Sequence, residues 1–149
     1  MSLQPGQKLG YYVVSRHLGA GTMGVVYEAT DTRLDRKVAL KLIHEELARE
    51  ADFRARLAQE ATRAARINSP YVVKVWEYGE ESDASYVSLE YVDGPTLREA
   101  ADSLSLEAKL DIAVQLAAGL HAAHEVGVIH RDLKPENIKL TRSGEARIL

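Results

Sequence analysis

The chain has 149 residues, of which 46% are hydrophobic and 28% charged, with a net charge of −3 and no cysteine. This length allows one domain with a real core or two small lobes, and the composition excludes wholesale disorder. The negative charge argues against a nucleic-acid surface, and the lack of cysteine excludes disulfides and thiolate metal sites. No run approaches the roughly 18 apolar residues of a membrane span, and the N-terminus lacks the features of a signal peptide. We therefore expect a soluble, cytoplasmic chain without a membrane span.

The chain begins with a polar, loose lead-in over residues 1–8, followed by a strand predicted over residues 11–18 from their aromatic and β-branched side chains. Gly19, Gly21 and Gly24 then form a Gly-x-Gly-x-x-Gly motif. In a dinucleotide-binding fold this motif opens a helix, but the residues that follow here favour a strand. The sequence therefore predicts a glycine-rich hairpin, whose backbone N–H groups can approach a phosphate closely. A flexible hairpin turn without a ligand is the alternative.

A lysine lies inside the next predicted strand, residues 38–43. Within an apolar strand, Lys41 must either extend its ammonium group to water or find an anion. Helical spacing of apolar residues predicts a helix over residues 51–67, and Glu60 falls on its apolar stripe. Each of these two charges needs a partner, so Glu60 is the candidate partner of Lys41. The alternatives are an exposed Glu60 and a Lys41 whose ammonium group reaches solvent.

Two more strands are predicted over residues 71–78 and 85–92. An acidic turn over residues 79–84 joins them. The N-terminal part of the chain therefore contains five predicted strands and one long helix.

Two helices are predicted next. Thr96 and Glu99 have the spacing of a capping box that starts a short helix, and residues 105–125 form a longer one. The apolar stripe of the longer helix consists of Leu106, Leu110, Ala113, Ala117 and Leu120. His121 and His124 lie three residues apart on it, but no third ligand is evident, so we expect no metal site there.

The polar run 130–137, His-Arg-Asp-Leu-Lys-Pro-Glu-Asn, lies between two apolar runs and is predicted to be a loop. In it, Asp132 can accept a hydroxyl proton, Lys134 can neutralise phosphate oxygens, and Asn137 can ligate a metal. His130 is expected to brace the loop rather than to take part in the chemistry. An ordinary polar turn with a helix-capping aspartate is the alternative.

The glycine-rich hairpin, the strand lysine, the helix glutamate and the polar loop follow each other in an order that resembles the eukaryotic-type serine/threonine protein kinases, over nearly the whole chain. Lys134 in the loop is typical of the serine/threonine branch, and the Ala- and Arg-rich helices resemble bacterial members. The resemblance implies an α+β, protein-kinase-like fold. Residues 1–92 would form an N-lobe with a five-stranded antiparallel sheet and one long helix. Residues 93–149 would form a truncated, mostly helical C-lobe that ends in a hairpin over 138–140 and 146–149.

The resemblance also implies ATP and Mg²⁺ as cofactors. Asp132 would orient the acceptor hydroxyl, Lys134 would stabilise the transferring phosphoryl group, and Asn137 would hold one magnesium ion. Lys41, paired with Glu60, would position the nucleotide. The nucleotide-binding residues implied by the family are Leu18, Gly19, Gly21, Gly24, Val26, Ala39, Lys41, Leu89, Glu90 and Val92, with backbone groups of the last two bonding the adenine. Plain core packing is the alternative for the apolar members.

The sequence ends at Leu149, about where the family carries an Asp-Phe-Gly motif whose aspartate holds magnesium. We therefore expect the N-terminal fragment of a kinase that transfers the ATP γ-phosphoryl group to a protein hydroxyl, with the fragment alone inactive. One alternative is a non-catalytic nucleotide-binding or regulatory module. A small-molecule kinase is disfavoured by Lys134 and the Pro-Glu-Asn that follows it. An exposed stripe on the helix over residues 105–125 would lead to self-association or poor stability unless another chain covers it.

Overall fold

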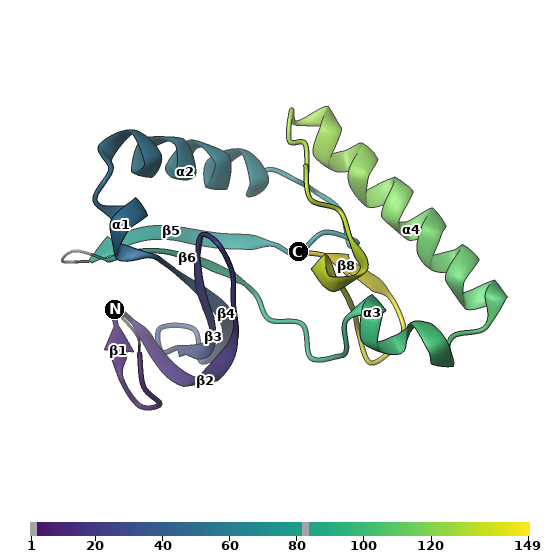
Figure 1. The fold of residues 1–149 in the computed structure, drawn as a ribbon, viewed down its shortest axis with the longest axis horizontal. Helices are drawn as coiled ribbons and strands as arrows, with labels where there is room; N and C mark the ends of the chain where they lie inside the picture. Colours follow the sequence, from purple (N-terminus) through teal and green to yellow (C-terminus); the bar gives the residue numbers. More distant parts are fainter. Residues whose placement is uncertain (1–2, 82–83) are drawn as a thin grey trace. The chain divides into compact units, whose positions relative to one another are not determined.

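The computed structural model describes residues 3–81 and 84–149, which form two compact units. The first unit contains the described residues up to Ala65 together with Val75–Tyr91, and the second contains Arg66–Lys74 and Val92–Leu149. The elements of the first unit are β1 (Lys8–Leu9), β2 (Tyr12–Ala20), β3 (Gly24–Asp31), β4 (Arg36–Ile43), α1 (Glu45–Ala48), α2 (Ala51–Ala64), β5 (Val75–Glu81) and β6 (Ala84–Glu90) (Figure 1). Those of the second are α3 (Leu97–Ala100), the 3₁₀ turn η1 (Ala101–Ser103), α4 (Leu106–Glu125), the 3₁₀ turn η2 (Pro135–Asn137), β7 (Ile138–Leu140) and β8 (Ala146–Ile148). The expected α+β class is confirmed.

The sheet of the first unit has six strands in the order β1-β2-β3-β4-β6-β5, one more than we expected, and all its pairs are antiparallel. The additional strand is β1, which pairs Lys8 with Val13 and is too short for an alternating pattern to reveal. The lead-in is also not loose, because Leu3 is buried and its N–H donates to the Tyr27 hydroxyl at 3.1 Å. Residues 1–2 of that lead-in lie outside the described residues.

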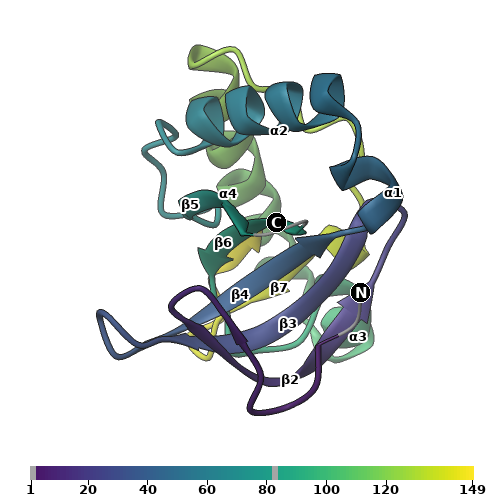
Figure 2. The same cartoon turned by 90° about the vertical axis from the view of Figure 1, so that its left-hand side faces the viewer.

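The core of the first unit lies on one face of this sheet. Alternate residues of β4, namely Val38, Leu40 and Leu42, are buried there, whereas Ala39 and Lys41 point to the opposite face and are half-buried. Figure 2 shows β2, β3 and β4 as neighbouring strands, in agreement with their pairing. The predicted strand that carries Lys41 is therefore present, and the lysine is half-buried in it.

The long helix α2 contacts β5 within the same unit. It ends at Ala64, three residues earlier than we predicted, and a short helix that we did not anticipate, α1, precedes it. Arg54 of α2 donates to the carbonyl of Ala48, the last residue of α1, at 2.7 Å. On α2, Ala61 is buried and Leu57 half-buried, so only a narrow stripe faces inward.

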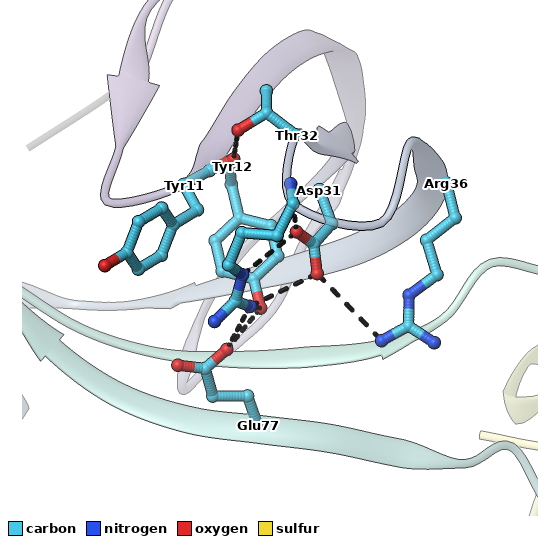
Figure 3. A network of polar contacts seen from close by, with 7 residues as sticks. Tyr11, Tyr12, Asp31, Thr32, Arg36 and Glu77 are labelled. Atoms are coloured by element: carbon cyan, nitrogen blue, oxygen red, sulfur yellow. Dashed lines mark hydrogen bonds and ion pairs between the residues drawn. The ribbon is translucent and has the colours of Figure 1, made fainter.

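A network of polar side chains joins the start of β2, the end of β3 and the start of β4 to β5 (Figure 3). Asp31 is fully buried and accepts hydrogen bonds from Arg33, whose guanidinium group also donates to Glu77 at 2.7 Å. The Tyr12 hydroxyl donates to the same Glu77 oxygen at 2.7 Å, and burial raises the pKa of Tyr12 to about 12. A buried carboxylate costs free energy unless it is paired, so Asp31 must keep these partners in the folded state. The network therefore fixes the ends of the strands that are not joined by the glycine-rich hairpin.

The segment that we expected as a strand over residues 71–78 is divided between the units. Strand β5 begins only at Val75. Residues 71–73 instead pair with β8. The N–H of Val73 donates to the carbonyl of Ile148 at 2.9 Å, and the N–H of Ile148 donates to the carbonyl of Tyr71 at 2.8 Å. Most of the expected turn over 79–84 belongs instead to strands β5 and β6, and residues 82–83 lie outside the described residues.

The second unit packs α4 against the β7–β8 hairpin. The predicted capping box is present: Thr96 accepts from the Glu99 N–H at 3.2 Å, and the Glu99 carboxylate accepts from the Thr96 N–H at 2.7 Å. The helix α4 matches the predicted one, but it buries Ile112, Gly119 and Ala123. The stripe that we listed is exposed along Leu106, Leu110, Ala113 and Ala117, as we expected for this chain alone. Within the two described stretches, no helix has the length and apolarity needed to cross a membrane.

Candidate functional site

The glycine-rich motif forms the predicted hairpin between β2 and β3, and its three glycines have different surroundings. The N–H of Gly21 donates to the carbonyl of Gly24 at 2.9 Å and closes the turn. A Cβ atom at Gly24 would lie 2.1 Å from the carbonyl oxygen of Leu42, so close packing against β4 requires glycine there. A Cβ atom at Gly19 or Gly21 would meet nothing within 4 Å. The open backbone available to a phosphate therefore lies at the first two glycines.

His44 holds this hairpin and was not anticipated from the sequence. Its ring Nε2 lies 2.9 Å from the carbonyl oxygen of Gly21, and its backbone N–H donates to the carbonyl of Met23 at 3.0 Å. Because His44 directly follows β4, the strand that carries Lys41 also anchors the tip of the hairpin. No motif marks this residue; only the pairing of Gly24 with Ile43 places it next to the loop.

The predicted nucleotide-binding side chains of the first unit lie together on the sheet face opposite the core. Val26 of β3 pairs directly with Lys41 of β4, and Ala39 of β4 pairs with Leu89 of β6. Residues directly opposite each other in antiparallel strands project to the same face. These four residues and Leu18 are half-buried, so the face is neither closed core nor open surface.

Lys41 and Glu60 do not form the expected ion pair in the described part of the chain. Glu60 is exposed on α2, whose inward residue at that level is Ala61, so its placement on the buried stripe was wrong. The Lys41 ammonium group is instead perturbed by burial alone, which lowers the pKa of Lys41 below its ordinary value. A partly desolvated cation on this sheet face favours the binding of an anionic ligand.

Glu90 and Val92, the expected adenine contacts, lie on either side of the boundary between the units. Glu90 is the last residue of β6 and pairs with Val38, whereas Val92 is buried in the second unit. Tyr91 between them receives a hydrogen bond from the Arg16 guanidinium group at 3.1 Å. Arg16 is in turn bonded to the buried carboxylate of Glu28 at 2.8 Å.

The polar loop brings the three predicted residues of the second unit together. The ammonium group of Lys134 lies 2.9 Å from Asp132 Oδ2, and the Asn137 side-chain amide donates to the same oxygen at 3.1 Å and to the Asp132 carbonyl at 2.8 Å. Pro135 begins the 3₁₀ turn that carries Asn137 back toward Asp132. The loop is therefore organised by its own side chains.

His130 braces this loop, as we predicted. Its Nδ1 accepts a hydrogen bond from the Asp132 N–H at 3.3 Å, so the proton lies on Nε2, which donates to the carbonyl of Leu149 at 2.8 Å. The N–H of Leu149 donates to the Asn137 carbonyl at 2.9 Å. Arg131 takes a left-handed backbone conformation, φ 65°, which is uncommon outside glycine and turns the chain between His130 and Asp132.

These contacts favour the ionised form of Asp132. The hydrogen bond from Lys134 is the largest effect and holds the pKa of Asp132 below its ordinary value; desolvation opposes it, and the Lys134 charge and the Asn137 amide add smaller effects in the same direction as the hydrogen bond. Asp132 is therefore an ionised, exposed carboxylate at neutral pH. Such a group can orient and polarise a hydroxyl group by accepting its hydrogen bond. No cluster of three or more His, Cys, Asp or Glu side chains that could hold a metal occurs among the residues described.

The first unit thus has a half-buried lysine and a glycine-rich hairpin, and the second a carboxylate held by a lysine and an asparagine; these residue types are those that phosphoryl transfer uses. The family profile described as "Protein kinase domain" matches residues 12–149. The chain belongs to the protein kinase family.

Relatives and solved structures agree with this assignment. The chain is 44% identical over 149 residues to the serine/threonine-protein kinase PknD of Mycobacterium tuberculosis, covering 98% of this chain and 22% of the relative. It is 36% identical over 142 residues to PrkC of Bacillus subtilis, covering 93% and 22%. The crystal structure of the M. tuberculosis PknI kinase domain matches with a TM-score of 0.82 and 31% identity, over 99% of this chain and 62% of that one. The expected protein-kinase-like fold is thus confirmed, and the chain spans less than a quarter of the length of these curated relatives.

Proposed function

We propose that the protein is a serine/threonine kinase that transfers the γ-phosphoryl group of ATP to a hydroxyl group of a protein substrate. The observation that carries this proposal is the cluster of Asp132, Lys134 and Asn137, held together at 2.9 and 3.1 Å. Asp132 accepts the hydrogen bond of the acceptor hydroxyl and takes its proton as the new bond from that oxygen to the γ-phosphorus forms and the bond from the γ-phosphorus to the bridging oxygen breaks, which releases ADP. The ammonium group of Lys134, which lies next to the Asp132 carboxylate, stabilises the negative charge that develops on the transferring phosphoryl group. The Pro-Glu-Asn continuation of Lys134 favours a protein substrate over a small molecule.

We place the nucleotide on the remaining predicted residues. Lys41 binds its phosphate oxygens, and the backbone of Gly19 and Gly21 approaches them from the hairpin. The half-buried side chains of Leu18, Val26, Ala39 and Leu89 cover the base, and backbone groups of Glu90 and Val92 bond its edge. Glu60 can pair with the Lys41 ammonium group only in another conformation, in which the Glu60 side chain turns toward the sheet. Because ATP is supplied in the cytoplasm, we place the reaction there, in a bacterial cell like those of the relatives.

Asn137 is the residue of this chain that fits a magnesium ion. Its side-chain NH₂ group is directed at Asp132, which leaves its carbonyl oxygen available, and oxygen is the donor that Mg²⁺ takes. When bound, the ion would neutralise phosphate charge during transfer. Asn137 would thereby join the metal to the loop that holds the acceptor hydroxyl.

The experiment is phosphate transfer from radiolabelled ATP to a serine- and threonine-containing protein by the full-length protein, with ATP binding followed by calorimetry. Asp132→Asn keeps the shape of the side chain but removes the proton acceptor, so we expect turnover to fall about 10²- to 10⁴-fold with ATP binding largely intact. Asp111→Asn, an exposed aspartate on α4, is the control and should keep full activity. Full activity of Asp132→Asn contradicts the assignment.

A second candidate is a non-catalytic nucleotide-binding or regulatory module. It is favoured by the absence of an ion pair between Lys41 and Glu60 in the described chain, because active kinases hold that pair. The same experiment separates the two functions. ATP binding by the unsubstituted protein without any phosphate transfer, under conditions in which a known kinase is active, would select the module.

We further propose that the 149-residue chain on its own self-associates through the exposed stripe of α4. Leu106 and Leu110 of this stripe are 73% and 59% exposed, and Val114, one turn after Leu110, is 70% exposed. Exposed apolar side chains that lie together favour burial against another molecule. Size-exclusion chromatography with light scattering should give a mass above that of the monomer. The Leu106→Glu/Leu110→Glu variant should return it to a monomer, whereas Lys109→Glu should not. A monodisperse monomer without substitution contradicts self-association.

A further inference from the structure

The short segment that leaves the first unit and leads into α3 is held tightly against β7. The N–H of Leu140 donates to the carbonyl of Pro95 at 2.9 Å, and Thr96 forms an isolated antiparallel bridge with Lys139. A Cβ atom at Gly94 would lie only 1.9 Å from the carbonyl oxygen of Leu140, so the two backbones are in direct contact. Residues 92–96 therefore take their position from β7, within one compact unit.

Lys139 makes a second connection between the same two segments. Its neighbours Ile138 and Leu140 are buried in the core of the second unit, so strand alternation directs Lys139 to the other face of β7. Its ammonium group donates to the carbonyl of Gly94 at 2.9 Å and lies 3.4 Å from that of Val92. The side chain is half-buried, and within the described ranges it forms no ion pair with a carboxylate. A lysine ammonium group bonded to two backbone carbonyls is thus built into the fold here.

We propose that Lys139 is a positioning residue for nucleotide binding: it holds Val92–Gly94 in the conformation that receives the nucleobase. This role rests on the proposed function, in which the Val92 backbone bonds the base. The Val92 side chain is 6% exposed and its carbonyl is held by Lys139, so the orientation of its peptide groups is restricted on both sides. Charge-assisted hydrogen bonds are stronger than neutral ones, which makes this restriction hard to replace by water.

The same strand links this position to the chemistry. Lys139 follows Asn137 by two residues, so the β7 backbone connects the proposed magnesium ligand to the segment that binds the base. Loss of the ammonium group leaves the Asp132–Lys134–Asn137 contacts untouched, because Lys139 takes part in none of them. The consequence is an effect on nucleotide affinity that is separate from the transfer step.

The test compares Lys139→Met, Lys139→Arg and the control Lys109→Met in the full-length protein by steady-state kinetics. Lys139→Met keeps the aliphatic chain and loses the donor; we expect its KM for ATP to rise about tenfold with kcat within about twofold, the pattern of lost uniform binding. Lys139→Arg retains a charged donor and should recover most of the affinity, and Lys109→Met, on the exposed side of α4, should match the unsubstituted protein. An unchanged KM in Lys139→Met overturns the proposal.

A second variant keeps the proposal testable if Lys139→Met does not fold. Gly94→Ala forces the segment away from β7 while Lys139 remains in place, and we expect the same rise in the KM for ATP. An unchanged KM in Gly94→Ala overturns the role. If the unsubstituted protein neither binds ATP nor transfers phosphate, the proposed function fails and this role fails with it. Normal activity with a wild-type KM in the variants removes this role alone.

Discussion

The two units hold their candidate site residues by different means. In the first unit, Val26, Lys41 and Leu89 are placed by the register of β3, β4 and β6, through backbone hydrogen bonds that do not depend on those side chains. In the second, Asp132 and Asn137 lie on a loop and a 3₁₀ turn, where side-chain hydrogen bonds add to a few backbone contacts in placing them. Replacing one of these site side chains should therefore leave the site geometry of the first unit unchanged, but should alter both the chemistry and the geometry of the second.

Among the variants that test this contrast between the units, Lys134→Met should have the largest effect. This variant removes the contact that holds the Asp132 carboxylate and the charge facing the phosphoryl group, so we expect activity to fall by about a hundredfold. The pKa of Asp132 should rise toward its ordinary value, which carboxyl-carbon NMR titration measures, and the acidic limb of the activity profile should move to higher pH.

Lys134→Arg is the matched control, because it keeps a cation at the same place. It should hold the pKa of Asp132 low. An unchanged pKa of Asp132 in Lys134→Met would mean that the loop does not depend on this side chain, and the contrast between the two units would disappear.

The glycines of the hairpin test whether the first unit depends on its backbone. Gly24→Ala places a Cβ atom against the Leu42 carbonyl, and we expect it to lower the free energy of unfolding by about 2 kcal/mol. Gly21→Ala meets no atom within 4 Å and should lie within about 0.5 kcal/mol of the unsubstituted chain. Denaturant unfolding of both variants is the measurement. Equal stabilities would mean that the hairpin yields, so that its backbone register does not hold the site rigidly.

Much of this arrangement could be predicted from the sequence. Lys41 was correctly located within a strand whose neighbouring residues are buried, and the motif 130–137 correctly brought Asp132, Lys134 and Asn137 together. These predictions succeeded because strand alternation and a short loop are local properties.

The failures involve contacts between segments far apart in the chain. Glu60 was assigned to the buried stripe of α2 from spacing alone, but its orientation depends on how α2 rests on β5, which no local pattern contains. Lys139 and His44 each contact backbone carbonyls, at Gly94 and Gly21, and a carbonyl acceptor leaves no trace in residue type. The two-residue strand β1 was too short to detect by periodicity.

The smallest predicted effect concerns Lys41. Its charge should favour ATP binding but lower the free energy of unfolding. Burial lowers the pKa of Lys41 from 10.5, which means that the folded state disfavours its charged form. This destabilisation is fully present at pH values below the folded-state pKa, where both states are charged, and it disappears as the pH rises through 10.5, where both become neutral. Lys41→Met should therefore raise the free energy of unfolding by about 1 kcal/mol at neutral pH while weakening ATP binding.

Denaturant unfolding at neutral and alkaline pH measures this gain in stability and its decline as the pH rises. Lys109→Met is the exposed control. A loss of stability at neutral pH would show that Lys41 supports the sheet, and its register would then not be independent of the side chains it carries.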